Sequence, residues 1–164
     1  MAYDGNIKYR QYIKFIDNIF IDKVNIDNLN INTNCSGAVS FFINLNATVQ
    51  EIGCDDLELR LTVNTPDGTQ VACDTWGATG IKNFRNVFVE NPQLWWPNGM
   101  GEQPLYTYEL SLLKAGEVCD SKTGRFGIRE VELEEKPLGA DKMGFAFIVN
   151  GEHCFCKGAN WVPL

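Results

Sequence analysis

The chain has 164 residues, of which 45% are hydrophobic and 21% are charged, and its formal net charge is −7. This length allows one domain with a substantial core. The acidic balance argues against a nucleic-acid partner, because phosphate contact requires a basic face. No apolar run reaches the length of a transmembrane helix, so we expect no membrane partner either.

The first half of the chain is dominated by a two-residue hydrophobic period, which is typical of half-buried strands. Residues 13–33 predict one long or two short strands, and residues 38–50 and 56–64 alternate between apolar and polar positions. A Pro-Asp-Gly turn at 66–68 then predicts a short return strand. Residues 84–90 are apolar on both faces, which suggests a central strand.

The second half continues the same pattern after a loop rich in proline and glycine. Residues 105–113, 117–127 and 129–135 predict three further strands, and 136–144 suggests an exposed loop. Asn150-Gly151 is a strong signal for a two-residue hairpin. Seven or more short strands without any helical period predict an antiparallel β-sandwich, with an up-and-down barrel as the alternative.

The chain contains six cysteines but no metal-binding template. It has no C-x-x-C pair and only one histidine, His153, so we expect no metal site. We expect free thiols in a reducing compartment. The N-terminus has no apolar segment of a secretory signal, and together these features favour a cytoplasmic location. The cysteines are Cys35, Cys54, Cys73, Cys119, Cys154 and Cys156.

Read alone, the residues indicate no active site. His153, beside the predicted hairpin turn, is better explained as a solvated turn residue than as a catalytic base. Asp55-Asp56 falls in a turn, and a second set of carboxylates is best explained as the wet face of a strand. That set is Glu130, Glu132, Glu134 and Glu135.

The loop NPQLWWPNGMGEQPLY (91–106) carries two adjacent tryptophans, Trp95 and Trp96, followed by Pro97. Exposed tryptophan is unusual unless it binds or packs on something. The pair could plug the end of its own sandwich, contact another domain, or form a platform on which a sugar stacks. Pro97 stiffens the loop, which suits all three readings.

Three ordered motifs resemble the middle of glycoside hydrolase family 2 enzymes, of the β-mannosidase and exo-β-glucosaminidase branch. They are the tryptophan loop, then GRFGIREVEL (124–133), then FAFIVNGEHCFCKGANWVPL (145–164). The resemblance implies a parent with a jelly-roll domain, an immunoglobulin-like sandwich and a TIM barrel that binds the carbohydrate substrate. This chain would be the immunoglobulin-like antiparallel β-sandwich at 15–144. Residues 1–14 would be a linker from the jelly roll, and 145–164 a hairpin and the entry to the barrel.

The resemblance implies that this chain is not an enzyme by itself. The family's two catalytic glutamates lie in the barrel, which needs about 250 residues. No acidic residue here inherits their role. The parent would be a retaining exo-acting glycosidase of the β-mannosidase type, working through a glycosyl-enzyme intermediate. No cofactor is implied.

The resemblance also assigns contacts between domains. Trp95, Trp96 and Pro97 would contact the neighbouring jelly-roll and barrel domains or plug the end of their own sandwich, and the sugar platform becomes less favoured. Arg125 and Arg129, expected on one face of one strand, would either reach the barrel or be solvated. Asn160 and Trp161 would stand at the barrel entry. The alternative function is a carbohydrate-binding module that uses the Trp95-Trp96 loop.

Overall fold

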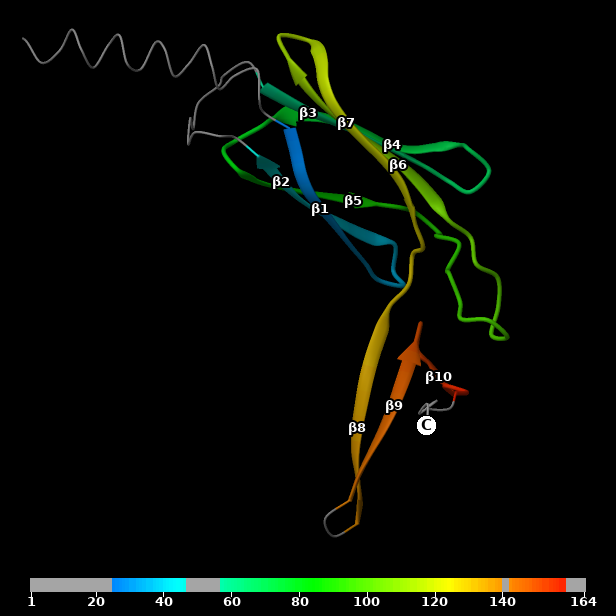
Figure 1. Ribbon diagram of the computed structural model, residues 1–164. Coiled ribbons are helices and arrows are strands. Elements are labelled where there is room, and N and C mark those ends of the chain that lie inside the picture. The colour runs from blue at the N-terminus through cyan, green and yellow to red at the C-terminus, as the bar shows by residue number, and fades with distance from the viewer. Residues whose placement is uncertain (1–24, 47–56, 140–141, 159–164) are drawn as a thin grey trace, which may run out of the picture.

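The computed structural model describes residues 25–46, 57–139 and 142–158 (Figure 1). Within these residues the chain is all-β and its strands form three sheets, of order β1-β2-β5, β4-β3-β6-β7 and β10-β9-β8. Every strand pair is antiparallel. The strands are β1 (Asn25–Thr33), β2 (Ala38–Asn46), β3 (Leu57–Asn64), β4 (Gln70–Gly77), β5 (Lys82–Phe88), β6 (Tyr106–Lys114), β7 (Glu117–Phe126), β8 (Val131–Gly139), β9 (Lys142–Val149) and β10 (Glu152–Cys154).

The first seven strands make an immunoglobulin-like sandwich, as predicted. Alternation sets the layers: Leu59 and Leu61 of β3 are fully buried, while Glu58 and Arg60 face outward. The facing layer supplies the alternate residues of β2, such as Phe41. Because the strands divide into two separate sheets around one core, the barrel alternative is wrong for the described residues.

The last three strands form an arm that leaves the sandwich. Figure 1 shows β8 and β9 running away from both sandwich layers, with β10 returning beside β9. The predicted two-residue turn is confirmed at Asn150 (φ 51°) and Gly151 (φ 85°). Since β8 belongs to the arm, the sandwich strands end at Phe126. The division of the chain into domains at 14 and 144 stays a prediction.

Two expectations about single elements are wrong. Strand β5 is an edge strand rather than a central one, and its outward-facing Phe84 and Phe88 are exposed. The expected loop at 136–144 is a hairpin instead, because β8 continues to Gly139 and β9 begins at Lys142. Pro137 is tolerated there because β8 is also an edge strand, where a missing N–H need not break a ladder.

Several expectations lie outside the described residues. These are the linker at 1–14, the Asp55-Asp56 pair, and the barrel-entry residues Asn160 and Trp161. In the part of the chain that the structure describes, no helix is long and apolar enough to cross a membrane.

Candidate functional site

A four-residue crossing, Gly127 to Glu130, joins the sandwich to the arm and is held by hydrogen bonds from several other segments. Ile128, at its centre, is fully buried in the sandwich core. The Ile128 carbonyl accepts a hydrogen bond of 2.9 Å from the Trp95 backbone N–H. Leu94 and Ile128 also form an isolated parallel bridge. The tryptophan loop therefore begins by pairing with the crossing.

The Trp95 indole packs on the crossing itself. A Cβ built on Gly127 would lie 2.7 Å from Trp95 Cγ, so only glycine leaves room for the ring. The Arg129 guanidinium carbon lies 4.5 Å from the centroid of the Trp95 ring, which is a cation–π contact. The ring is thus enclosed between a bare backbone and a cation of its own chain, and it is only partly exposed.

Trp96 packs on the other side of its loop. A Cβ on Gly101 would lie 2.8 Å from Trp96 Cγ, so this glycine too serves as a seat for an indole. The Trp96 N–H donates to the Glu102 carbonyl at 2.9 Å, and Gln103 Nε2 donates to the Trp96 carbonyl at 3.2 Å. Pro97 opens the turn, accepting at its carbonyl from Met100 N–H at 3.0 Å.

Thr33, at the end of β1, and Cys35, in the turn that follows, hold the crossing from another direction. Thr33 Oγ1 donates to the Arg129 carbonyl at 2.7 Å and accepts from the Arg129 N–H at 3.1 Å, so one side chain replaces a strand partner. The Cys35 thiol donates to Glu130 Oε2 at 2.8 Å. This hydrogen bond, with the nearby carboxylate charge, raises the pKa of the Cys35 thiol above its ordinary value.

Asn150 ties the arm back to both segments. Its Oδ1 accepts from the Glu130 N–H at 2.9 Å, and its Nδ2 donates to the Trp95 carbonyl at 3.1 Å. Its own N–H donates to the Glu130 carbonyl at 3.0 Å. One amide therefore joins the arm turn, the crossing and the tryptophan loop. We call this set of contacts, from Thr33, Cys35, Trp95 and Asn150 to residues 127–130, the junction.

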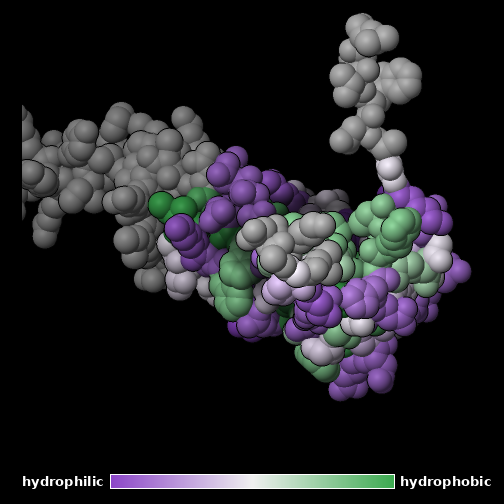
Figure 2. Space-filling model, turned by 90° about the horizontal axis from the view of Figure 1, so that it is seen from below, coloured by the Kyte–Doolittle hydropathy of each residue, from purple (hydrophilic) through white to green (hydrophobic). Residues whose placement is uncertain are grey.

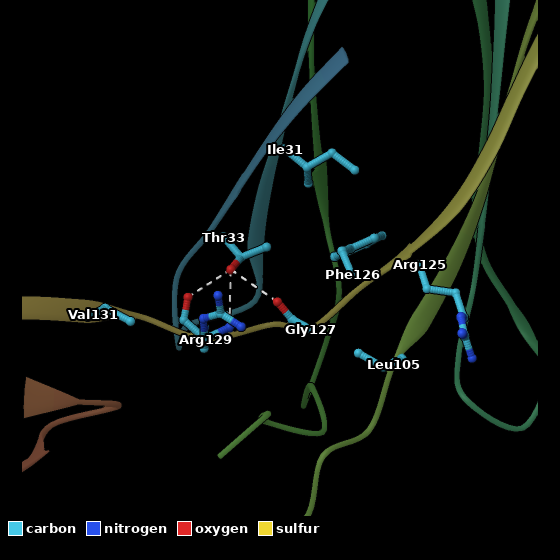
Figure 3. A pocket seen from close by; sticks show the side chains of 8 residues that line it. All are labelled: Ile31, Thr33, Leu105, Arg125, Phe126, Gly127, Arg129 and Val131. Carbon is cyan, nitrogen blue, oxygen red and sulfur yellow. Dashed lines mark hydrogen bonds between the residues drawn. The ribbon is translucent and has the colours of Figure 1, made fainter. Parts of the chain in front are cut away.

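A shallow pocket beside the junction is lined by both predicted arginines (Figure 3). The expectation that Arg125 and Arg129 share one strand face is wrong, because β7 ends at Phe126. Figure 3 shows the Arg125 side chain leaving the pocket on the opposite side from Arg129. Their contact with another domain stays a prediction, as it does for Trp95, Trp96 and Pro97.

Substituting Gly127 by alanine should disturb the junction without touching the core. The new Cβ would overlap the Trp95 ring, so we expect a loss of about 1–3 kcal/mol of unfolding free energy and a shift of tryptophan emission. Urea denaturation and emission spectra measure both. Gly77→Ala is the control, because its Cβ would meet nothing within 4 Å. Equal stability and emission for the two variants would contradict the packing described here.

The sequence matches one family model over most of the described sandwich. The model for "Glycosyl hydrolases family 2" covers residues 24–129. The chain belongs to glycosyl hydrolases family 2. The matched region includes strands β1 to β7 and the crossing as far as Arg129. The arm lies beyond it.

Named relatives of this family 2 chain are much longer than it is. Beta-mannosidase B of Aspergillus clavatus is 42% identical over 120 residues, which is 71% of this chain and 14% of that protein. Beta-mannosidase B of Emericella nidulans is 46% identical over 77 residues, 46% of this chain and 9% of that protein. The crystal structure of Beta-D-Mannosidase from Dictyoglomus thermophilum aligns with a TM-score of 0.68 and 28% identity, covering 86% of this chain and 18% of that one.

Two acidic residues that the sequence singles out, Glu130 and Glu134, have partners close to them in the structure. Glu130 accepts from Cys35 at the junction, and Glu134 pairs with Lys136 at 2.7 Å. His153 Nε2 lies 3.9 Å from Glu134 Oε2 on the exposed arm. Within residues 25–46, 57–139 and 142–158, no group of three or more His, Cys, Asp or Glu side chains could hold a metal ion.

The cysteines of the family 2 chain are free wherever the structure describes them. The described thiols are Cys35, Cys73, Cys119, Cys154 and Cys156. The cytoplasmic location that they suggested stays a prediction. Sequence reasoning missed the roles of Thr33 and Cys35, and no local pattern marks them. It found Asn150 only as a turn residue, although its side chain also joins three segments.

Proposed function

We propose that this chain is a non-catalytic scaffold domain of a longer β-mannosidase-type glycosidase, and that it serves to hold neighbouring domains in a fixed relation. The observation that carries the proposal is the arm, whose apolar face is exposed in the described residues except at Val149. The length of the relatives supports it, since each aligned named relative extends far beyond the matched part.

The apolar face of the arm follows from its register. Val131 pairs with Val149, Leu133 with Phe147, Glu135 with Phe145, and Pro137 with Met143. These side chains lie on one side of the ribbon, and all but Glu135 are apolar. Phe145 is 66% exposed and Leu133 is 54% exposed. Figure 2, seen from below, shows apolar (green) side chains exposed beside hydrophilic ones. A group of large exposed apolar side chains of this kind suggests an interaction site.

The junction holds the arm, and with it this apolar face, in a defined orientation to the sandwich. A small sheet with one uncovered apolar face gains little stability by itself. Hydrogen bonds from Thr33, Trp95 and Asn150 nevertheless fix the crossing at its base. A rigid base and an unpartnered face suit an element that a following domain covers. We take that domain to be the catalytic barrel of the parent.

The alternative, sugar binding by the Trp95-Trp96 loop, is less well supported. Each indole is seated on a glycine of its own chain, and Trp95 is covered further by Arg129. Seated rings leave less of their faces for a pyranose to stack on. The packing favours the reading in which the loop closes its own sandwich and shapes the junction.

The proposal predicts that the chain alone does not hydrolyse an aryl β-mannoside, because the carboxylate pair that such chemistry needs would lie outside it.

The proposal also predicts that the arm binds an apolar dye such as anilinonaphthalene sulfonate. Phe145→Ser should weaken dye binding, whereas Val118→Ser, at an exposed valine of β7, should not. Turnover that persists through purification would overturn the non-catalytic assignment, and equal dye binding by both variants would remove the arm's role.

A further inference from the structure

The outer face of the β1-β2-β5 sheet differs from the rest of this acidic chain. Its outward positions, taken from the register between Asn28 and Phe88, are amides, small residues, three phenylalanines and one lysine. None of these positions carries a carboxylate, although the chain has 21 acidic residues and a net charge of −7. Asp27, at the bulge beside Asn28, marks one end of this carboxylate-free surface.

The centre of the face is an aromatic pair. Phe42 and Phe84 are register partners on adjacent strands, with ring centroids 4.9 Å apart and planes inclined by 48°. They are 42% and 51% exposed, and Phe88 further along β5 is 61% exposed. Aromatic rings of this kind present a flat apolar surface to solvent.

Amide side chains lie beside the pair, both on its own row and on the two neighbouring rows. Asn30 is the register partner of Phe42 on β1, so the row Asn30–Phe42–Phe84 crosses all three strands over about 10 Å. Asn44 lies on the next row on one side, and Asn86, which accepts from Ser40 Oγ at 2.8 Å, lies on the other. Each amide both donates and accepts hydrogen bonds.

We propose that this face binds a neutral oligosaccharide chain, independently of the Trp95-Trp96 loop. A pyranose combines an apolar face of C–H groups with a rim of hydroxyls that donate and accept. Exposed rings flanked by amides match both features. The lack of carboxylates among the outward positions matches an uncharged ligand rather than a basic one. The scaffold would thereby hold polymeric substrate near the parent's catalytic domain. The choice of a mannan-type chain as the ligand rests on the proposed function.

Isothermal titration calorimetry of the 164-residue chain with β-linked mannohexaose tests the proposal. We expect saturable binding that weakens about tenfold in Phe42→Ala, because stacking on one ring contributes up to about a factor of ten. Phe84→Ala, on the edge strand, should weaken it similarly and serves as a second variant should Phe42→Ala fold poorly. Phe145→Ala, on the arm, should leave binding unchanged and is the matched control.

Results that contradict the proposal can be told apart from one another. Lack of heat with mannohexaose, cellohexaose and xylohexaose would overturn the proposal. Binding that disappears in Trp96→Ala but persists in Phe42→Ala would move the site to the loop. Self-association of the chain that Phe42→Ala abolishes, without sugar binding, would make the face a protein contact. If the chain binds mannohexaose and also hydrolyses it, the scaffold function fails while the binding face stands.

Discussion

Gly37→Ala is expected to be among the most damaging single substitutions in the sandwich. Gly37 ends the turn between β1 and β2 with φ at 93°, a region that L side chains rarely adopt. A Cβ there would lie 2.1 Å from the Val89 carbonyl oxygen, which is backbone and cannot swing aside. The backbone strain and the overlap together should cost about 2–5 kcal/mol of unfolding free energy.

Gly68→Ala separates the two causes. Gly68 has nearly the same φ, 91°, but a Cβ there would meet nothing within 4 Å. Its substitution should therefore cost only the conformational strain, about 1–2 kcal/mol. Urea denaturation of the two variants beside the unmodified chain measures the difference. If both variants lose the same free energy, the close approach of Gly37 to Val89 contributes nothing.

Phe41→Ala is expected to have an effect of similar size through the core. Phe41 is fully buried and packs edge-on against Tyr108 and Phe126, with centroids 6.1 Å and 6.0 Å away. Removing the ring leaves a cavity between the two sheets, which typically costs about 3–5 kcal/mol. The expected readout is a lower urea midpoint with an unchanged slope.

The adjacent Phe42 provides the control for Phe41. It is the same residue type on the same strand, but it points to the outer face and is 42% exposed. Phe42→Ala should cost about 0.5–1.5 kcal/mol, because it loses only the contact with Phe84. Equal losses for the two variants would mean that β2 is not fixed in the register described. The mild effect also keeps Phe42→Ala usable in the binding experiment.

Most of the fold could be predicted from the alternation of apolar and polar residues within single strands. In β3 the period of two gives Leu59 and Leu61 to the core and Glu58 to solvent, and the burial follows that order. Asn150-Gly151 likewise predicts its turn from local chemistry alone, because Asn and Gly tolerate the positive φ that the turn needs. Local signals of this kind do not depend on what lies across the sheet.

The element at 84–90 shows where such local reasoning fails. Residues apolar on both faces predicted a central strand, yet β5 is at an edge and its outer phenylalanines are exposed. Apolar side chains are also found exposed, so their presence alone does not place a strand at the centre of a sheet. Phe84 and Phe88 are exposed in the described residues.

The sequence by itself determined most of the strands, which face of each lies in the core, and the resemblance to the family, because these depend on periodicity and on ordered motifs along the chain. Only the tertiary structure decided how the tryptophan loop packs. Thr33 and Cys35 form hydrogen bonds with residues 127–130, which lie some 95 positions away in the sequence. The Trp95 and Trp96 rings pack against Gly127 and Gly101, where a larger residue would overlap them. Contacts between distant segments arise from the packing of two sheets, and no local pattern of residues encodes which backbone a ring will meet.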